Sequence, residues 1–172
     1  PVVYPAAFGQ GIIAVGATTN TDEWSPFSGA RDYIDIVAPL VESLNTIFDT
    51  VGPEDIYSSI PCDNYSHKSG TSMAAPQVSG IASLLMGYAQ ENLGISLFND
   101  DIEQIIKISA EDVNSISNPG WDQFLGKGRV NARAALDLIS ESDLKHWTTS
   151  GGTSVGNTGT YTMVFFSTPG LS

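Results

Sequence analysis

The sequence is short of several residue types, and each shortage excludes a class of protein. Basic residues are few, with 7 Lys and Arg against 19 Asp and Glu, which gives a formal net charge of −12. This balance argues against a nucleic-acid or anionic membrane partner, because such surfaces select for Lys and Arg. No apolar run approaches the ~20 residues that a membrane-spanning helix needs, so we expect no membrane span.

Cysteine is also scarce. Cys62 is the only one, which excludes a disulfide within these residues. No base in the sequence marks it as a catalytic thiol, and we expect a small buried side chain or a loop position. The chain opens Pro-Val-Val-Tyr, without an initiator Met or a basic leader, and this opening is typical of the middle of a protein.

What is present indicates a soluble α/β protein. Hydrophobic residues make up 41% of the chain, an ordinary share for a globular domain. Residues 12–17 form a β-branched apolar run that predicts a strand buried on both faces, as in a parallel sheet. A second strand is predicted over residues 33–39, ended by Pro39. Residues 42–68 predict an irregular surface excursion, with a short strand near residues 55–60.

Three helices are predicted in the second half of the chain. The first spans residues 72–90 and has so little polar face that we expect burial almost all round. The second follows Asn99, a good N-cap residue, with Ile102, Ile105, Ile106 and then Ile108 or Ala110 as its apolar stripe. The third covers residues 131–139. Beyond residue 140 the composition becomes polar and Gly/Ser/Thr-rich, and residues 160–167 predict a strand.

The chemistry of the chain centres on Ser72, in the run SGTSMAAP over residues 69–76. A serine hydroxyl attacks a carbonyl only when a base takes its proton and donors stabilise the oxyanion. Ser72 is predicted at the start of the first helix, where unpaired N–H groups and the positive dipole end would face that oxyanion. Gly70 allows close backbone approach, and Pro76 is expected in the first turn, where a missing N–H costs least.

These residues carry a resemblance to a known family. Residues 70–80, GTSMAAPQVSG, resemble the serine signature of the subtilisin-like serine proteases (subtilases, peptidase S8) almost position for position. Residues 4–8, 13–17, 35–39 and 126–132 resemble further landmarks of that family in the right order. The resemblance implies a three-layer α/β/α fold with a mostly parallel sheet over residues 1–140, and a linker entering an accessory β-rich region over residues 141–172.

The resemblance also implies a function, and it shows which catalytic residues of the family these 172 residues lack. The implied function is a secreted serine endopeptidase that hydrolyses proteins or peptides through an acyl-enzyme on Ser72. The family's aspartate, histidine and oxyanion asparagine belong upstream of the serine, and none appears in residues 1–71. We interpret His67 as a loop histidine and His146 as solvated. The 172 residues alone are therefore predicted to be inactive.

Other interpretations concern single residues and the class of protein. Asp35 matches an aspartate that joins a weak cation site in some relatives, but a surface aspartate is the favoured interpretation. No cofactor is expected for the chemistry, although structural calcium is possible in the full-length protein. Thr71 is expected to assist the oxyanion or set backbone geometry, and Met73 to pack against the nucleophile. We expect a monomer. The alternative function is a non-catalytic relative whose scaffold serves binding.

Overall fold

The computed structural model describes residues 3–9, 11–25, 28–29, 31–40, 55–141, 145–149 and 161–165, the last two ranges and Glu141 by backbone only. Two parallel strands form its centre: β1 (Val15–Thr18) and β2 (Ile36–Pro39). Val15 pairs with Ile36, and Thr18 with Pro39. The predicted parallel pair is confirmed, with each strand shorter at its start than expected, and Pro39 is the last strand residue as predicted.

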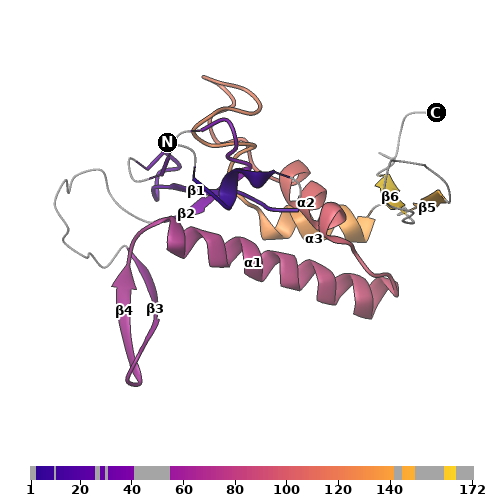
Figure 1. Cartoon of the computed structure of the whole chain (residues 1–172), viewed down its shortest axis with the longest axis horizontal. Coiled ribbons are helices and arrows are strands. Elements are labelled where there is room, and N and C mark those ends of the chain that lie inside the picture. Colours follow the sequence, from indigo (N-terminus) through magenta and orange to yellow (C-terminus); the bar gives the residue numbers. More distant parts are fainter. Residues whose placement is uncertain are drawn as a thin grey trace.

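A long helix packs along this pair. Helix α1 (Thr71–Tyr88) continues into a π-helical turn, η2 (Ala89–Leu93). Helices α2 (Asn99–Ile108) and α3 (Ala132–Glu141) lie beside α1 and the strands (Figure 1). A 3-10 turn, η1 (Ala6–Phe8), follows the cis Tyr4–Pro5 bond. These elements confirm an α/β protein.

The core lies between the strand pair and the helices. In β2 the side chains alternate, so that Ile36 and Ala38 join the main core while Val37 joins a smaller cluster with Ile34 and Leu125. The main core also takes the predicted stripe of α2, Ile102, Ile105 and Ile106, all buried. Ile108 is exposed, and Ala110 packs against the core instead.

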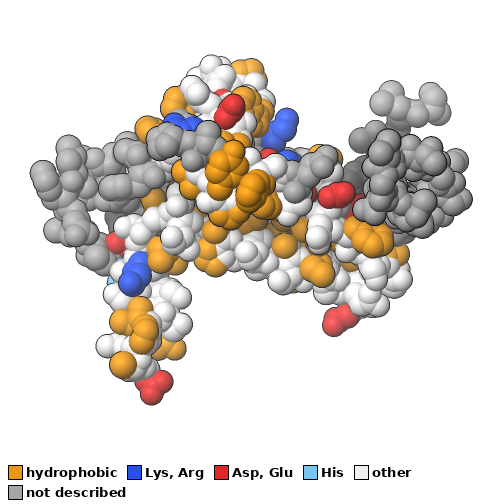
Figure 2. All heavy atoms as spheres, in the orientation of Figure 1, with side chains coloured by type: hydrophobic (Ala, Val, Ile, Leu, Met, Phe, Trp, Pro, Cys, Tyr) orange, Lys and Arg blue, Asp and Glu red, His pale blue; other side chains and the backbone are white. Residues whose placement is uncertain are grey.

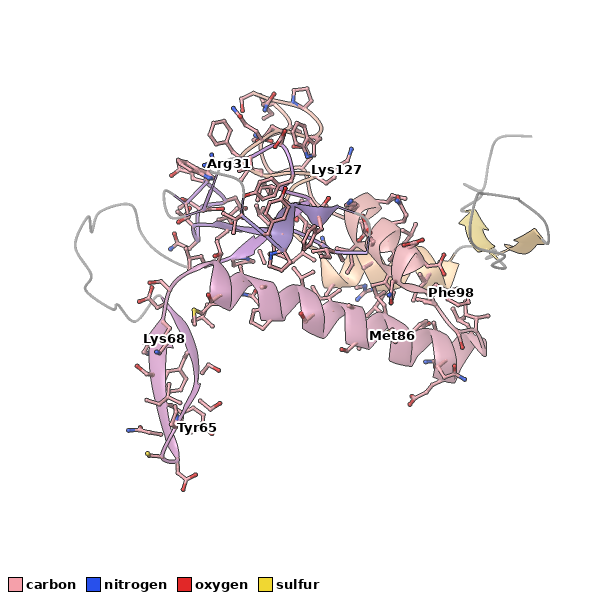
Figure 3. The ribbon with its side chains drawn as sticks, viewed as in Figure 1. Arg31, Tyr65, Lys68, Met86, Phe98 and Lys127 are labelled. Carbon is pink, nitrogen blue, oxygen red and sulfur yellow. The ribbon has the colours of Figure 1, made fainter. Side chains whose placement is uncertain are left out.

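The prediction that α1 is buried almost all round is wrong for the described residues. Ala74, Val78 and Leu85 are its buried positions, whereas Leu84 and Met86 are about half exposed (48% and 50%). Because the strands and the other two helices pack on one side of α1, its opposite side stays in contact with solvent. Figure 3 shows Met86 on the side of α1 that faces away from α2 and α3.

The start of α2 also differs from its prediction by one residue. Asn99 is the first helical residue, and Phe98 holds the N-cap position. The Phe98 N–H donates to the Asp101 carboxylate at 2.9 Å. The acid at the third helical position thus accepts from the backbone N–H of the N-cap residue, whereas an Asn99 cap would have accepted from N–H groups inside the first turn.

The stretch predicted as irregular contains an antiparallel hairpin. Strands β3 (Ile56–Ile60) and β4 (Asn64–Lys68) pair with Ile56 opposite Lys68 and Ile60 opposite Asn64. The hairpin projects from the start of α1, away from the strand pair and helices (Figure 1). The short strand near residues 55–60 is confirmed, and its partner was missed. Residues 41–54 lie outside the described residues.

Towards the end of the chain, β5 (Lys145–Thr149) pairs antiparallel with β6 (Tyr161–Phe165). Strand β6 confirms the strand predicted over residues 160–167, and β5 was not predicted. His146 lies on β5, and its side chain is outside the description. None of the described helices is both long enough and apolar enough to cross a membrane.

Candidate functional site

Ser72 is the second residue of α1, and its side chain is exposed. Gly70 precedes the helix with φ +135° and ψ 156°, a conformation that residues with a Cβ rarely adopt. The chain therefore turns sharply into the helix, and the Met73 N–H closes the turn on the Gly70 carbonyl at 2.8 Å. A helix start leaves its first N–H groups without helical acceptors, so Ser72 lies among donors available to an anion.

Pro76 differs from its prediction. It is the sixth residue of α1, in the second turn, and is exposed. At that position a residue with an N–H would donate to the carbonyl four residues earlier, which is that of Ser72. The proline therefore leaves the Ser72 carbonyl without its helical partner.

The site end of α1 is fixed to the sheet by Gln77. Its side-chain amide donates to the Pro39 carbonyl at 2.7 Å and to the Met73 carbonyl at 3.0 Å. One side chain thus connects the second turn of α1 to the last residue of β2. This bond holds the helix start at the carboxyl end of the parallel strands, where ligands commonly bind in α/β sheets.

A cavity of about 310 Å³ adjoins Ser72. Ser72, Met73 and Pro76 line it from α1, and the hairpin supplies the other wall. The hairpin residues that line it are Ile56, Ser58, Ser59, Ile60, Pro61, Ser66 and Lys68. The wall was not predicted, because the hairpin had no clear alternation of polar and apolar residues. Met73 lines the same cavity as Ser72. Thr71 opens the helix and is half-buried.

His67 does not reach Ser72. Its ring Nδ1 lies 3.1 Å from the Asp55 carbonyl, and the ring centroid lies 4.8 Å from that of Tyr57. By strand alternation His67 and Tyr57 share the hairpin face opposite Lys68. His67 is therefore a strand residue with partners of its own. Cys62 is exposed in the hairpin turn at φ +70°, so the loop alternative holds.

Asp35 is partly buried rather than a free surface aspartate, and both of its carboxylate oxygens have protein partners. One carboxylate oxygen accepts from the Ala14 N–H at 2.8 Å, and the other lies 2.7 Å from the Lys107 ammonium. Lys107 also contacts Glu103 at 2.6 Å. Burial lowers the pKa of the Lys107 amine, but its bonds to Asp35 and Glu103 outweigh burial, and the pKa lies above its ordinary value. The lysine thus supplies the positive charge that a cation would bring.

Elsewhere the described residues hold no group of three or more His, Cys, Asp or Glu side chains suited to a metal ion. Near the start of the chain, Val3 and Tyr4 are exposed at 55% and 63%. The Tyr4 ring packs against Phe8 with centroids 4.9 Å apart. Neither residue lines the cavity beside Ser72.

Comparison with known proteins gives concordant matches. The family model described as "Subtilase family" matches residues 1–128. The chain is 37% identical over 99 residues to the major intracellular serine protease of Bacillus subtilis (strain 168), covering 58% of this chain and 27% of that protein. It is 33% identical over 129 residues to the extracellular basic protease of Dichelobacter nodosus, covering 74% and 19%.

A solved structure agrees in fold. The crystal structure of a lanthipeptide protease matches with a TM-score of 0.68 and 27% identity, over 79% of this chain and 43% of that one. The chain thus spans about a quarter or less of the two curated relatives above and under half of this structure.

Proposed function

The chain belongs to the subtilase family, and from that premise we propose that it carries the nucleophile of a serine endopeptidase, Ser72. The hydroxyl would attack the scissile carbonyl and form an acyl-enzyme that water then hydrolyses. The single observation that carries this role is the placement of Ser72: exposed, in the first turn of α1, behind a glycine at φ +135°. The Ser72 N–H would be one oxyanion donor.

The general base and the residue that orients it would come from residues other than these 172. In support, the one histidine whose side chain is described, His67, contacts Asp55 and Tyr57 rather than Ser72. Without a base the serine keeps its proton at neutral pH. The isolated 172 residues are therefore proposed to be inactive.

The remaining assignments extend this proposal. The substrate would be a protein or peptide, cleaved by a secreted, monomeric enzyme that needs no cofactor for its chemistry. Extracellular and intracellular proteases both occur among the relatives, so secretion stands on the resemblance alone. Residues 1–140 would belong to the peptidase domain and residues 141–172 to an accessory β-rich region. Structural calcium, if the full-length protein holds it, would be bound away from Asp35.

The test is labelling of the full-length protein with a fluorophosphonate, which reacts with an activated serine. We expect one adduct, lost in Ser72→Ala and kept in Ser79→Ala. Ser79 is a fair control because it is exposed on the same helix and its hydroxyl donates to the Ala75 carbonyl. A folded full-length protein that remains unlabelled would favour the non-catalytic binding scaffold. Labelling of the isolated 172 residues at Ser72 would refute their proposed inactivity.

A further inference from the structure

The two faces of the hairpin differ in chemistry. Because side chains alternate along a strand, the cross-strand pairs Ile56–Lys68 and Ser58–Ser66 project to one face. The pair Tyr57–His67 projects to the other. The Tyr57 and Tyr65 rings stack there with centroids 5.5 Å apart. The first face lines the cavity beside Ser72 together with Ser59, and the rings of Tyr57, Tyr65 and His67 do not line it.

Apart from its charged end, this cavity is apolar or weakly polar. Isoleucine, proline and methionine side chains supply its hydrocarbon, and serine hydroxyls supply its polar groups. Ser72 is itself part of the lining. A peptide bound with its carbonyl at Ser72 would therefore place a residue that flanks the scissile bond in this cavity. The volume of about 310 Å³ is ample for one large side chain.

Among the described residues that line the cavity, Lys68 alone is charged. Its side chain forms no ion pair with a carboxylate of the described residues. Figure 3 places Lys68 at the end of the hairpin that leads into α1, and Figure 2 shows a basic side chain on this part of the hairpin. In a chain with 7 basic and 19 acidic residues, an ammonium with no carboxylate partner among the described residues, in the cavity that Ser72 also lines, is a local reversal of the overall charge. It would attract an anionic substrate group.

We propose that Lys68 makes this cavity a subsite for an acidic side chain next to the scissile bond. This inference rests on the proposed function, since it specifies which peptides Ser72 would cleave. The methylenes of a glutamate would contact the hydrocarbon wall while its carboxylate reaches the Lys68 ammonium. Lys68 is exposed in the free protein, and a bound peptide would partly enclose the ion pair. Because a partly enclosed ion pair is worth more than an exposed one, the expected preference is about tenfold, or ~1.4 kcal/mol.

The test uses the full-length protein and internally quenched peptides. A cleavable peptide is first selected from a mixed library and then varied to Glu, Gln or Lys on each side of the scissile bond. At one of these positions kcat/KM should be about tenfold higher for Glu than for its isostere Gln. Lys68→Met should reduce the ratio to about one, and Lys68→Glu should favour Lys instead. The ratio should also shrink as salt is raised.

Lys127→Glu is the matched control. It makes the same charge change at an exposed lysine that does not line the cavity (Figure 3) and should keep the tenfold ratio. A Glu-to-Gln ratio near one at both positions in a protein that cleaves peptides would overturn the Lys68 proposal and leave the proposed function intact. A preference retained in Lys68→Met would do the same. Absence of both cleavage and labelling at Ser72 would overturn the two together.

Discussion

Two segments outside the core differ in their hydrogen bonds: one bonds within itself, and the other bonds to the core. The hairpin, residues 56–68, makes its described hydrogen bonds within itself and to Asp55. The closing segment, residues 111–130, is bonded to the core through its second half, residues 121–130. The Trp121 indole N–H donates to the Ile34 carbonyl, and the Val37 and Val130 N–H groups bond across to Gly128 and Val37. The hairpin thus stands apart from the core, and the closing segment is anchored to it.

This difference indicates that substitutions in the two segments should have different effects, on folding in one and on binding in the other. In the closing segment, parts of the backbone lie so close to neighbouring backbone that one added side-chain atom would clash. In the hairpin, side chains face solvent or a cavity, so substitutions should change what binds more than whether the protein folds. The following predictions, for the full-length protein, test this contrast.

The largest effect is expected from Gly128→Ala. A Cβ at Gly128 would lie 2.2 Å from the Glu111 carbonyl oxygen, and the residue has φ +116°. Both the clash and the backbone oppose a side chain, so we expect a loss of about 4 kcal/mol or more in the free energy of unfolding, or failure to fold. Denaturant unfolding measures it.

Gly120→Ala is the control for that prediction. Gly120 also has a positive φ, +86°, but nothing lies within 4 Å of its Cβ position. Only the backbone term remains, and the expected loss is about 1–2 kcal/mol. Equal losses at Gly120 and Gly128 would show that close packing is not what holds the closing segment.

The next effect concerns Arg129. Its guanidinium bonds to Asp22 at 2.6 Å and to Glu111 at 2.7 Å, joining two loops. Arg129→Met should cost about 1–2 kcal/mol, because two carboxylates lose a forked, partly buried partner. Arg133→Met, which breaks a pair with an 85% exposed arginine, should cost about 0.5 kcal/mol or less in the same denaturant unfolding assay. A larger loss at Arg133 would contradict this ranking.

Asp122 should make the closing segment sensitive to acid. Burial raises the pKa of its carboxyl, but hydrogen bonds from the Asn114 amide and two backbone N–H groups outweigh burial, and the pKa lies below its ordinary value. A lowered folded pKa contributes stability above the unfolded pKa of about 3.9 and loses it as pH falls through the folded pKa. Below pH 4, the free energy of unfolding should therefore depend less on pH in Asp122→Asn than in the unsubstituted protein. An equal slope in the two proteins would contradict this prediction.

The smallest effect is expected in the hairpin. A double-mutant cycle with Tyr57→Ala and Tyr65→Ala should give a coupling of about 0.5 kcal/mol, because both rings are largely exposed. Peptide cleavage should stay within twofold, since the pair faces away from the cavity. A coupling above about 2 kcal/mol, or a tenfold loss of kcat/KM, would show that the aromatic face serves the core or the site.

Part of this arrangement was readable from the sequence. The parallel strands, the start of α1 and the buried stripe of α2 follow from apolar periodicity and from the Gly-Thr-Ser motif, which are local signals. Strand β4 was missed because its residues, NYSHK, are polar on both faces and carry no alternation. The burial of α1 was overestimated because apolar composition does not say which face has partners. The Asp35–Lys107 pair joins residues far apart in the chain, which no local pattern links.

The account depends most on Ser72 as an acylated nucleophile, and trapping the acyl-enzyme tests this directly. The full-length protein would be incubated with an activated ester, quenched in acid and cleaved with trypsin, and the peptide spanning residues 69–107 examined by mass spectrometry. We predict one acyl group, localised to Ser72 and absent from Ser72→Ala. An acyl group on another residue, or none on a folded full-length protein, would contradict the account.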